Sequence, residues 1–361
     1  MKKGLLVCLG IFLFLAIVSG NINNNSKTPF SDLEINKANK TVEGTETALE
    51  NEQRLNWNGD KENNIEEPIK TSKGTSQTDN GDAVKLVVST NYGRKILFNK
   101  EVPIKGEQTI LEVLEENMAV EKAYGGGFVN SIMGISSGYR QDNERMDWFY
   151  WVNGVMGNVG GGDYKVKKGD KIWWDYHPWS SSSIIPNVIG CFPEPFLQGY
   201  KGKSLSTVII CSERALRLAE KLKFALQHRG INSAIEVNLK KIPEDKIVIA
   251  LGTWPELEAN SLISAYNKNP KKVGLFVNFN TDGFFPLNDK GEKEILLSKA
   301  GAIVSLGSGL GNSTPLWLIT ATDQDTLNFT LDLVIEKPSL LENKIGLVTD
   351  GAKVYGLPWE G

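Results

Sequence analysis

The side chains best suited to bind a ligand lie in two aromatic stretches of the first half of the chain. Residues 147–154 read DWFYWVNG, and residues 171–177 read KIWWDYH. If both stretches are strands, alternate side chains point to opposite faces. One face then collects large rings with a carboxylate and an imidazole, which can stack on a flat ligand and hydrogen-bond to it. This candidate ligand-binding set is Phe149, Trp151, Trp173, Asp175 and His177.

The aromatic face has three interpretations. It packs against another part of the chain, it is a platform for a ring-shaped or sugar-like ligand, or it is a surface for a protein partner. An apolar patch that stays exposed requires such a role, because water disfavours it. The opposite face of the same strands is expected to line a helix-covered core through Trp148, Tyr150, Val152, Ile172, Trp174 and Tyr176.

Hydrophobic periodicity predicts the elements that position these strands. Residues 84–89 alternate as a strand, residues 91–94 form a turn, and residues 95–102 form a second strand. A helix is predicted to begin near residue 108, with the apolar stripe Ile110, Leu111, Val113 and Leu114. A hairpin, a helix and then further strands are the element order of an α+β fold of the β-grasp type.

A family resemblance lies in the same region. It is carried by WFYWVNG at residues 148–154, NVGGGDYKVKKGDKIWWDY at residues 158–176 and TILEVLEEN at residues 109–117. With these motifs, residues 83–178 resemble the DUF4430 domain, a β-grasp module related to the C-terminal domain of transcobalamin and intrinsic factor. The resemblance implies a ligand-facing surface, which in transcobalamin-like proteins closes over a corrinoid held mainly by an α/α-toroid domain. We see no toroid pattern in this chain, and cobalamin is the ligand that the resemblance implies.

The second half of the chain has a different pattern. From residue 204 to 361 strands alternate with helices, which predicts an α/β domain with a mainly parallel sheet. Strands are predicted at residues 208–210, 247–251 and 316–321, and a helix at residues 292–300. Ligands of such sheets bind beyond the carboxyl ends of the strands, where polar residues can also serve only as caps and turn formers. The secondary candidate site at this edge is Ser212, Arg214, Thr253, Asn280, Asp282, Thr322 and Asp323.

Three further motifs suggest chemistry but lack parts that it requires. Residues 134–138, GISSG, match G-x-S-x-G, which needs a strand before it, a helix after it and a histidine base. Residues 307–311, GSGLG, precede a β-like run, so no helix N-terminus would face a phosphate. Asp175 and His177 supply two ligands, whereas a zinc site takes at least three from the protein. We assign no catalytic residue and no metal ligand.

The start of the chain predicts export. Met1-Lys2-Lys3 and the apolar run after it are typical of a signal peptide at residues 1–20 or of a retained membrane anchor at residues 4–20. Residues 21–82 are polar and have almost no large apolar side chains, which predicts a disordered linker. Domains are then expected at residues 83–178 and 204–361, joined by a Pro- and Ser-rich linker at residues 179–203.

The composition of the chain limits the kinds of partner and chemistry that the protein is expected to have. The net charge of −3 offers no basic patch for nucleic acid. An exported chain permits a disulfide between Cys191 and Cys211, with buried free thiols as the alternative. The chain has two histidines, His177 and His228, which favours a binding protein over an enzyme.

These observations predict an extracytoplasmic bacterial protein, secreted or on the cell surface, whose β-grasp face binds a small ligand. The ligand would be a corrinoid, a carbohydrate or a cell-wall component. Two alternatives stay open. One is a structural or adhesive module that makes only protein contacts, and the other is a wall- or glycan-acting enzyme with its site in the α/β domain.

Overall fold

The computed structural model describes residues 81–123, 128–139, 143–178 and 184–360. Residues 80–361 form one compact unit. The predicted signal peptide or anchor and nearly all of the predicted polar linker lie outside the described residues. Across the described ranges, no helix is long and apolar enough to cross a membrane.

The first half of the described chain forms a six-stranded sheet with the order β2-β1-β9-β7-β6, to which β8 adds by pairing with β7. Its strands are β1 (Ala83–Thr90), β2 (Lys95–Pro103), β6 (Gly138–Tyr139), β7 (Arg145–Val152), β8 (Val155–Met156) and β9 (Lys171–Pro178). The central pair β1 and β9 is parallel, and β7 pairs with β9 in antiparallel register, with Trp151 opposite Trp173. The predicted strands at residues 84–89 and 95–102 are therefore confirmed.

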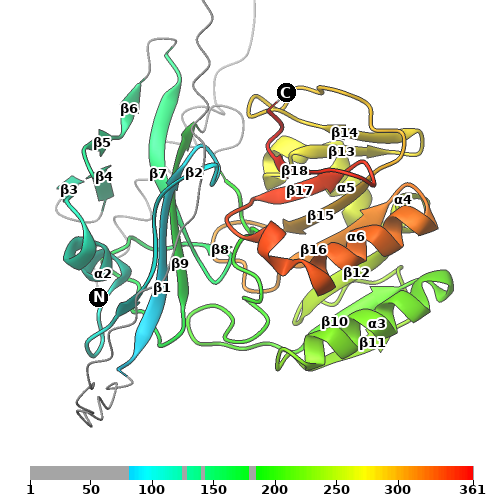
Figure 1. The fold of residues 1–361 in the computed structure, drawn as a ribbon, viewed down its shortest axis with the longest axis horizontal. Coiled ribbons are helices and arrows are strands. Elements are labelled where there is room, and N and C mark those ends of the chain that lie inside the picture. The colour runs from blue at the N-terminus through cyan, green and yellow to red at the C-terminus, as the bar shows by residue number, and fades with distance from the viewer. Residues whose placement is uncertain (1–80, 124–127, 140–142, 179–183, 361) are drawn as a thin grey trace, which may run out of the picture. The chain divides into compact units, whose positions relative to one another are not determined.

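One helix covers one face of this sheet. α2 (Ile110–Asn117) begins with a capping box, in which Thr109 and Glu112 satisfy each other's backbone N–H groups. Its apolar side chains pack in one cluster with Trp148 and Trp174. In Figure 1 the helix lies to the left of strands β1 and β9. A three-stranded sheet of β3 (Val120–Ala123), β4 (Phe128–Ile132) and β5 (Ile135–Ser136) follows the helix in sequence.

The second half forms a seven-stranded sheet with the order β11-β10-β12-β16-β15-β17-β18. Its strands are β10 (Thr207–Cys211), β11 (Ser233–Glu236), β12 (Ile247–Thr253), β15 (Gly301–Leu306), β16 (Leu316–Ala321), β17 (Gly346–Thr349) and β18 (Val354–Leu357). The strands from β11 to β16 in this order pair in parallel, whereas β15, β17 and β18 pair in antiparallel register. Three strand pairings of this sheet are therefore parallel and three are antiparallel, whereas the sequence predicts a mainly parallel sheet.

Helical segments cover both faces of the seven-stranded sheet. α3 (Leu216–Gln227) and α6 (Gln324–Glu336) lie in front of the sheet in Figure 1. Their side chains belong to the core on that face, where η2 (Glu213–Ala215) and η4 (Pro338–Leu341) also pack. The core on the other face receives side chains from α4 (Trp254–Leu257), α5 (Ser261–Lys268), η3 (Pro270–Val273) and the hairpin of β13 (Val277–Asn280) and β14 (Gly283–Pro286).

The helix predicted at residues 292–300 is wrong. Leu297 and Lys293 form bridges to the β14 side of the hairpin, with Phe284 and Leu297 exchanging hydrogen bonds of 3.0 and 2.9 Å. The backbone groups that a helix would pair locally are therefore used in sheet-like contacts, so tertiary pairing overrides the local helical pattern.

Candidate functional site

The two faces of the aromatic strands are divided as the alternation predicts. Trp148, Tyr150 and Trp174 belong to the cluster under α2. Trp151 and Trp173 belong to a different cluster on the opposite face, where their ring centroids lie 5.2 Å apart.

Of the three interpretations of this face, the structure shows the first, packing against another part of the chain, and not a platform open to solvent. Trp151 is 0% exposed and Trp173 is 1% exposed, Asp175 and His177 are also buried, and Phe149 is partly buried. The cover comes from later parts of the same chain, such as Ile185, whose carbonyl oxygen accepts a 2.8 Å hydrogen bond from Trp151 Nε1. Packing against the chain itself removes this large apolar area from water. Ligand binding by these residues stays a prediction, and the structure gives Trp151 and Trp173 no accessible surface for it.

The buried carboxylate of Asp175 organises a polar network. It accepts hydrogen bonds from the backbone N–H groups of Tyr92, at 2.8 Å, and Gly93, at 2.9 Å, and from the hydroxyl of Ser89 at 2.5 Å. Its other contact is with His177 Nδ1, at 2.8 Å. A buried charge is tolerated when it is hydrogen-bonded in this way. The network thus fixes the turn after β1.

Two rings hold the imidazole of His177. Tyr92 stacks on it with a centroid distance of 4.5 Å, and Phe149 stacks on it at 4.4 Å. Burial, followed by the charges of Asp289 and Asp175, raises the pKa of Tyr92, so its phenol stays neutral and donates to the carbonyl of Pro178 at 3.0 Å. The sequence marked residues 91–94 as a turn but gave no signal that Ser89 and Tyr92 join the predicted set.

The same turn contacts the last residues of the chain. Asn91 Nδ2 donates to Glu360 at 2.6 Å, and Arg94 forms an ion pair with Glu360 at 3.1 Å. Arg94 also donates to the carbonyl of Pro358. A Cβ atom on Gly93 would come within 1.9 Å of the Asn343 carbonyl oxygen, so this close approach requires glycine. The turn at residues 91–94 therefore holds the first sheet against the segments around Asn343 and Glu360.

The secondary candidate site lies where the parallel strands end. β10 is followed by α3, which packs on one face of the sheet, and β12 is followed by α4, which packs on the other. The chain order therefore reverses between β10 and β12, which is the switch point where open α/β sheets bind ligands. Ser212 follows β10, and Thr253 ends β12.

Glu256 joins these two strand ends. Its carboxylate accepts from the Ser212 hydroxyl at 2.9 Å and from the Thr253 backbone N–H and hydroxyl, both at 2.9 Å. Arg214 is exposed in the turn that follows Ser212. Residues 253–256, TWPE, have the sequence pattern of a capping box, but only the sheet order reveals the contact of Glu256 with Ser212. The resulting group of hydroxyls and one carboxylate can accept hydrogen bonds from a polar ligand and donate to it.

Asn280 and Asp282 do not belong to this edge. They lie at the turn of the β13–β14 hairpin, which is a separate two-stranded sheet, so their expected place at a strand end of the parallel sheet is wrong. Asn280 Oδ1 accepts from the backbone N–H of Asp282 at 3.3 Å. The hairpin forms because strands β13 and β14 are close in sequence and antiparallel, which the apolar pattern alone does not distinguish from one buried strand.

Thr322 and Asp323 follow β16 and cap α6. Asp323 accepts from the backbone N–H of Thr326 at 2.9 Å. Burial raises the pKa of Asp323, but hydrogen bonds from Thr326 and Thr322 and the charge of Lys299 outweigh it and hold the pKa below its ordinary value. These two side chains therefore have a clear role as a helix cap.

The glycine-rich segment at residues 307–311 packs against the first half of the unit. Gly311 N–H donates to the carbonyl of Met156 at 2.9 Å, and a Cβ atom on Gly307 would lie 2.0 Å from Asn187 Oδ1. β16, not a helix, follows the segment. Close packing therefore explains why glycines occur in this segment, without a role in phosphate binding.

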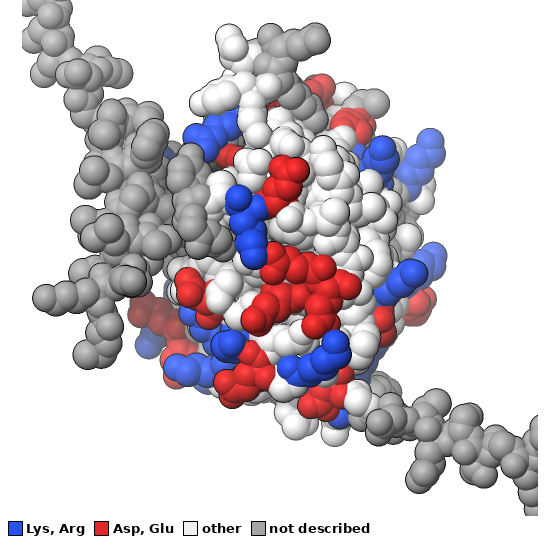
Figure 2. Space-filling view, turned by 90° about the vertical axis from the view of Figure 1, so that its left-hand side faces the viewer, with Lys and Arg blue, Asp and Glu red and all other residues white. Residues whose placement is uncertain are grey.

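A shallow acidic hollow lies on α2, lined by Gln108, Glu112, Glu115 and Glu116. Figure 2 shows acidic side chains gathered on this side of the molecule. Glu115 forms an ion pair with Lys122 at 2.5 Å, and Glu116 forms one with Lys105 at 3.4 Å. These ion pairs neutralise part of the negative charge of the hollow. Within the described ranges, no group of three or more His, Cys, Asp or Glu side chains could hold a metal ion. Cys191 and Cys211 are both buried and free.

Comparison with known proteins supports the resemblance found in the sequence. Residues 107–178 match the family described as "Domain of unknown function (DUF4430)". A crystal structure of haptocorrin in complex with Cbi is similar at a TM-score of 0.24 and 19% identity, covering 27% of this chain and 25% of that one. A "putative metal binding protein" from Ruminococcus gnavus is similar at a TM-score of 0.21 and 15% identity, covering 26% of this chain and 95% of that one. The chain thus spans a quarter of the haptocorrin chain, and no curated protein matches it.

Proposed function

We propose that the protein binds a small, hydroxyl-rich ligand, such as a carbohydrate, at the strand edge formed by Ser212, Thr253 and Glu256. The observation that carries the proposal is the 2.9 Å contact between Ser212 and Glu256 across the switch point of the sheet. It brings polar groups from two neighbouring strands to one place at the rim of the fold.

The chemistry of this edge suits a polyol. The oxygens of Ser212, Thr253 and Glu256 keep lone pairs beyond the hydrogen bonds described above, and the two hydroxyls can rotate toward a new acceptor. Arg214 adds an exposed guanidinium, which presents several donors in a fixed plane. A ligand with several hydroxyl groups can satisfy donors and acceptors together, whereas an apolar ligand would leave them unpaired.

The residues around the edge favour binding over catalysis. Of the two histidines in the chain, His177 is buried in the first half of the unit. His228 follows the last residue of α3, at the opposite end from Ser212 of a 12-residue helix that is roughly 18 Å long at 1.5 Å per residue. Glu256, the carboxylate that contacts both Ser212 and Thr253, is already engaged by three donors.

The proposal extends to the location of the protein and to the first half of the unit. We propose that the apolar start and the polar segment after it place the described residues outside the cytoplasm, as a β-grasp module joined to the ligand-binding sheet. Cell fractionation and protease accessibility on intact cells test the location. A corrinoid is the specific alternative ligand, and with Trp151 and Trp173 covered it too would have to reach the protein at an open edge.

Binding of soluble cell-wall saccharides to the full chain, measured by saturation-transfer NMR and calorimetry, tests the proposal. Arg214→Gln should weaken binding by about tenfold, because a charged hydrogen bond contributes about 1.5–3 kcal/mol. Arg217→Gln is the matched control, since Arg217 is an exposed arginine on the next turn of α3 and should bind as the wild type does.

Equal affinity of the wild type and the Arg214→Gln variant would refute the site. Cobalamin is tested in parallel by gel filtration, where bound corrinoid carries its colour with the protein. Cobalamin binding that Arg214→Gln leaves intact would replace the saccharide proposal with a corrinoid site elsewhere.

A further inference from the structure

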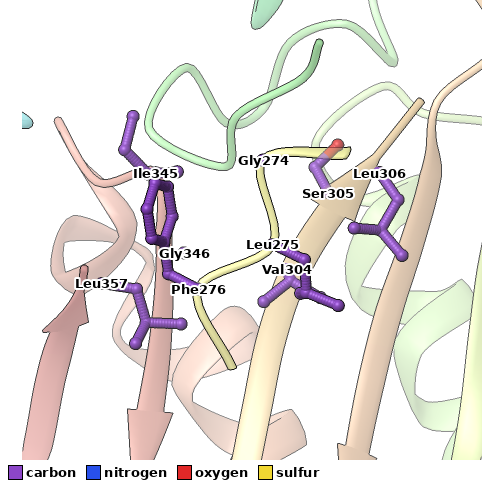
Figure 3. Close-up of a pocket in the computed structure, with 9 residues that line it drawn as sticks. All are labelled: Gly274, Leu275, Phe276, Val304, Ser305, Leu306, Ile345, Gly346 and Leu357. Carbon is purple, nitrogen blue, oxygen red and sulfur yellow. The ribbon is translucent and has the colours of Figure 1, made fainter. Parts of the chain in front are cut away.

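Two buried carboxylates outside the proposed ligand edge carry more than the small hollow between the segment before β13 and strands β15, β17 and β18 (Figure 3). The hollow has a volume of about 10 Å³ and a largely apolar lining, so it has room for no more than one water molecule. The two carboxylates are Asp170, which is 1% exposed, and Glu194, which is 4% exposed.

The two carboxylates come from segments that pack together. Asp170 immediately precedes β9 of the first sheet, whereas Glu194 belongs to residues 188–201, which follow that sheet in the chain. The backbone N–H groups of Val188 and Lys201 each donate to the first half of the unit at 3.0 Å. Both ends of residues 188–201, which we call the docked segment, are therefore fixed to the first half.

One carboxamide joins the two sides of this contact. Asn153 Nδ2 donates to Asp170 Oδ1 and to the carbonyl of Gly199 in the docked segment, both at 2.8 Å. Glu194 Oε2 accepts from the N–H of Gln198, the residue before Gly199, at 2.9 Å. The carboxylates of Asp170 and Glu194 thus belong to one hydrogen-bonded contact, in which the charge of Asp170 acts on Glu194.

Burial makes ionisation of this pair costly. Burial raises the pKa of Asp170, and hydrogen bonds from Lys167 and Asn153 with the charge of Lys167 offset it only in part. Burial also raises the pKa of Glu194, where hydrogen bonds from the docked segment oppose the rise and the charge of Asp170 adds to it. The other titratable or charged groups near the pair are Tyr164, Cys191 and Lys171. Burial raises the pKa of this phenol and of this thiol, so both are neutral.

We propose that Asp170 and Glu194 form a proton-dependent latch, which holds the docked segment more tightly on the first sheet as the pH falls. A carboxyl group whose pKa is raised in the closed state and ordinary in the open state stabilises the closed state below the ordinary value. This contribution is lost as the pH rises through the raised pKa, so the docked segment should open more easily toward higher pH. The latch is separate from the proposed ligand edge and does not depend on it.

A ¹³C NMR titration of the carboxyl groups in the full chain tests the pair. In the wild type both pKa values should lie above the ordinary Asp and Glu values. Asp170→Asn should lower the pKa of Glu194, because it removes the neighbouring charge. Asp163→Asn is the matched control, since it removes the same charge from an exposed position seven residues earlier and should leave the pKa of Glu194 unchanged.

Amide hydrogen exchange tests the opening of the docked segment. The protection of the Gln198 N–H, taken relative to the free-peptide exchange rate at each pH, should fall as the pH rises through the pKa values of the pair. Glu194→Gln should make this protection depend less on pH.

Wild-type carboxyl groups that titrate at or below their ordinary values would overturn the proposal, whether or not the variants fold. A Glu194 pKa that Asp170→Asn leaves unchanged would also overturn it, as would a protection of the Gln198 N–H that does not vary with pH.

Discussion

Replacement of Trp151 by alanine tests the burial of the aromatic face. The side chain is 0% exposed, its ring lies 5.2 Å from that of Trp173, and its Nε1 donates to Ile185. Removal of a fully buried tryptophan costs about 3–5 kcal/mol through lost burial and the cavity left behind. The carbonyl of Ile185 would also lose its donor, which places the expected loss at about 4 kcal/mol or more.

Urea denaturation followed by circular dichroism measures this loss, and a thermal scan should show a midpoint lower by about 10 °C, at a few degrees per kcal/mol for a unit of this size. Tyr139→Ala is the control, because Tyr139 is an aromatic residue of the same sheet that is 72% exposed. Its stability should change by less than about 0.5 kcal/mol. If the free energy of unfolding of Trp151→Ala lies within about 1 kcal/mol of the wild-type value, the indole is not packed as described. The interpretation of this face as an open platform would then be favoured.

Three further predictions concern the helix cap at Thr109, the clasp that Arg94 and Glu360 form as an ion pair, and the loop at residues 307–311. Thr109→Ala should lower the free energy of unfolding, measured in urea, by about 1 kcal/mol. Hydrogen bonds from Thr109 lower the pKa of Glu112, so the cap stabilises the fold above the ordinary glutamate pKa and this contribution is lost as pH falls through the lowered pKa of Glu112. A ¹³C NMR titration of the variant should show the pKa of Glu112 rising. A double-mutant cycle of Arg94→Met and Glu360→Gln should give a coupling of about 0.5–1 kcal/mol that shrinks in high salt, and a coupling of zero would exclude the ion pair from stability. Gly307→Ala should lower the thermal midpoint measurably, since its methyl group would meet the buried asparagine amide described above, and an unchanged midpoint would show that the loop is free to move.

The sequence predicted local features of the first sheet well. Alternation placed Trp148 and Trp151 on opposite faces, and the apolar stripe of α2 located that helix. These features depend on residues close in sequence, so the period of the apolar residues suffices to predict them.

The cover of the aromatic face could not be predicted in the same way. Ile185 contacts Trp151 and Phe276 contacts Tyr92 across long stretches of sequence, and no local pattern encodes these contacts. The same limit applies to the strand edge, where Glu256 reads as a cap in sequence and contacts Ser212 only because β10 and β12 are neighbours in the sheet. Of the predicted edge residues, the hairpin position of Asn280 was missed for a related reason, since pairing partner and direction are properties of the whole fold.

The clasp between Arg94 and Glu360 joins residues near the two ends of the compact unit, and Asn91 bonds to a residue 269 positions further along the chain. A ribosome therefore completes the first sheet long before the partner of its turn exists, and during that interval the indoles of Trp151 and Trp173 lack their final cover. Contacts of such long range slow folding and leave apolar surface open to aggregation while they form. The turn after β1 therefore acquires its hydrogen-bond and ion-pair partner only once Glu360 has been synthesised.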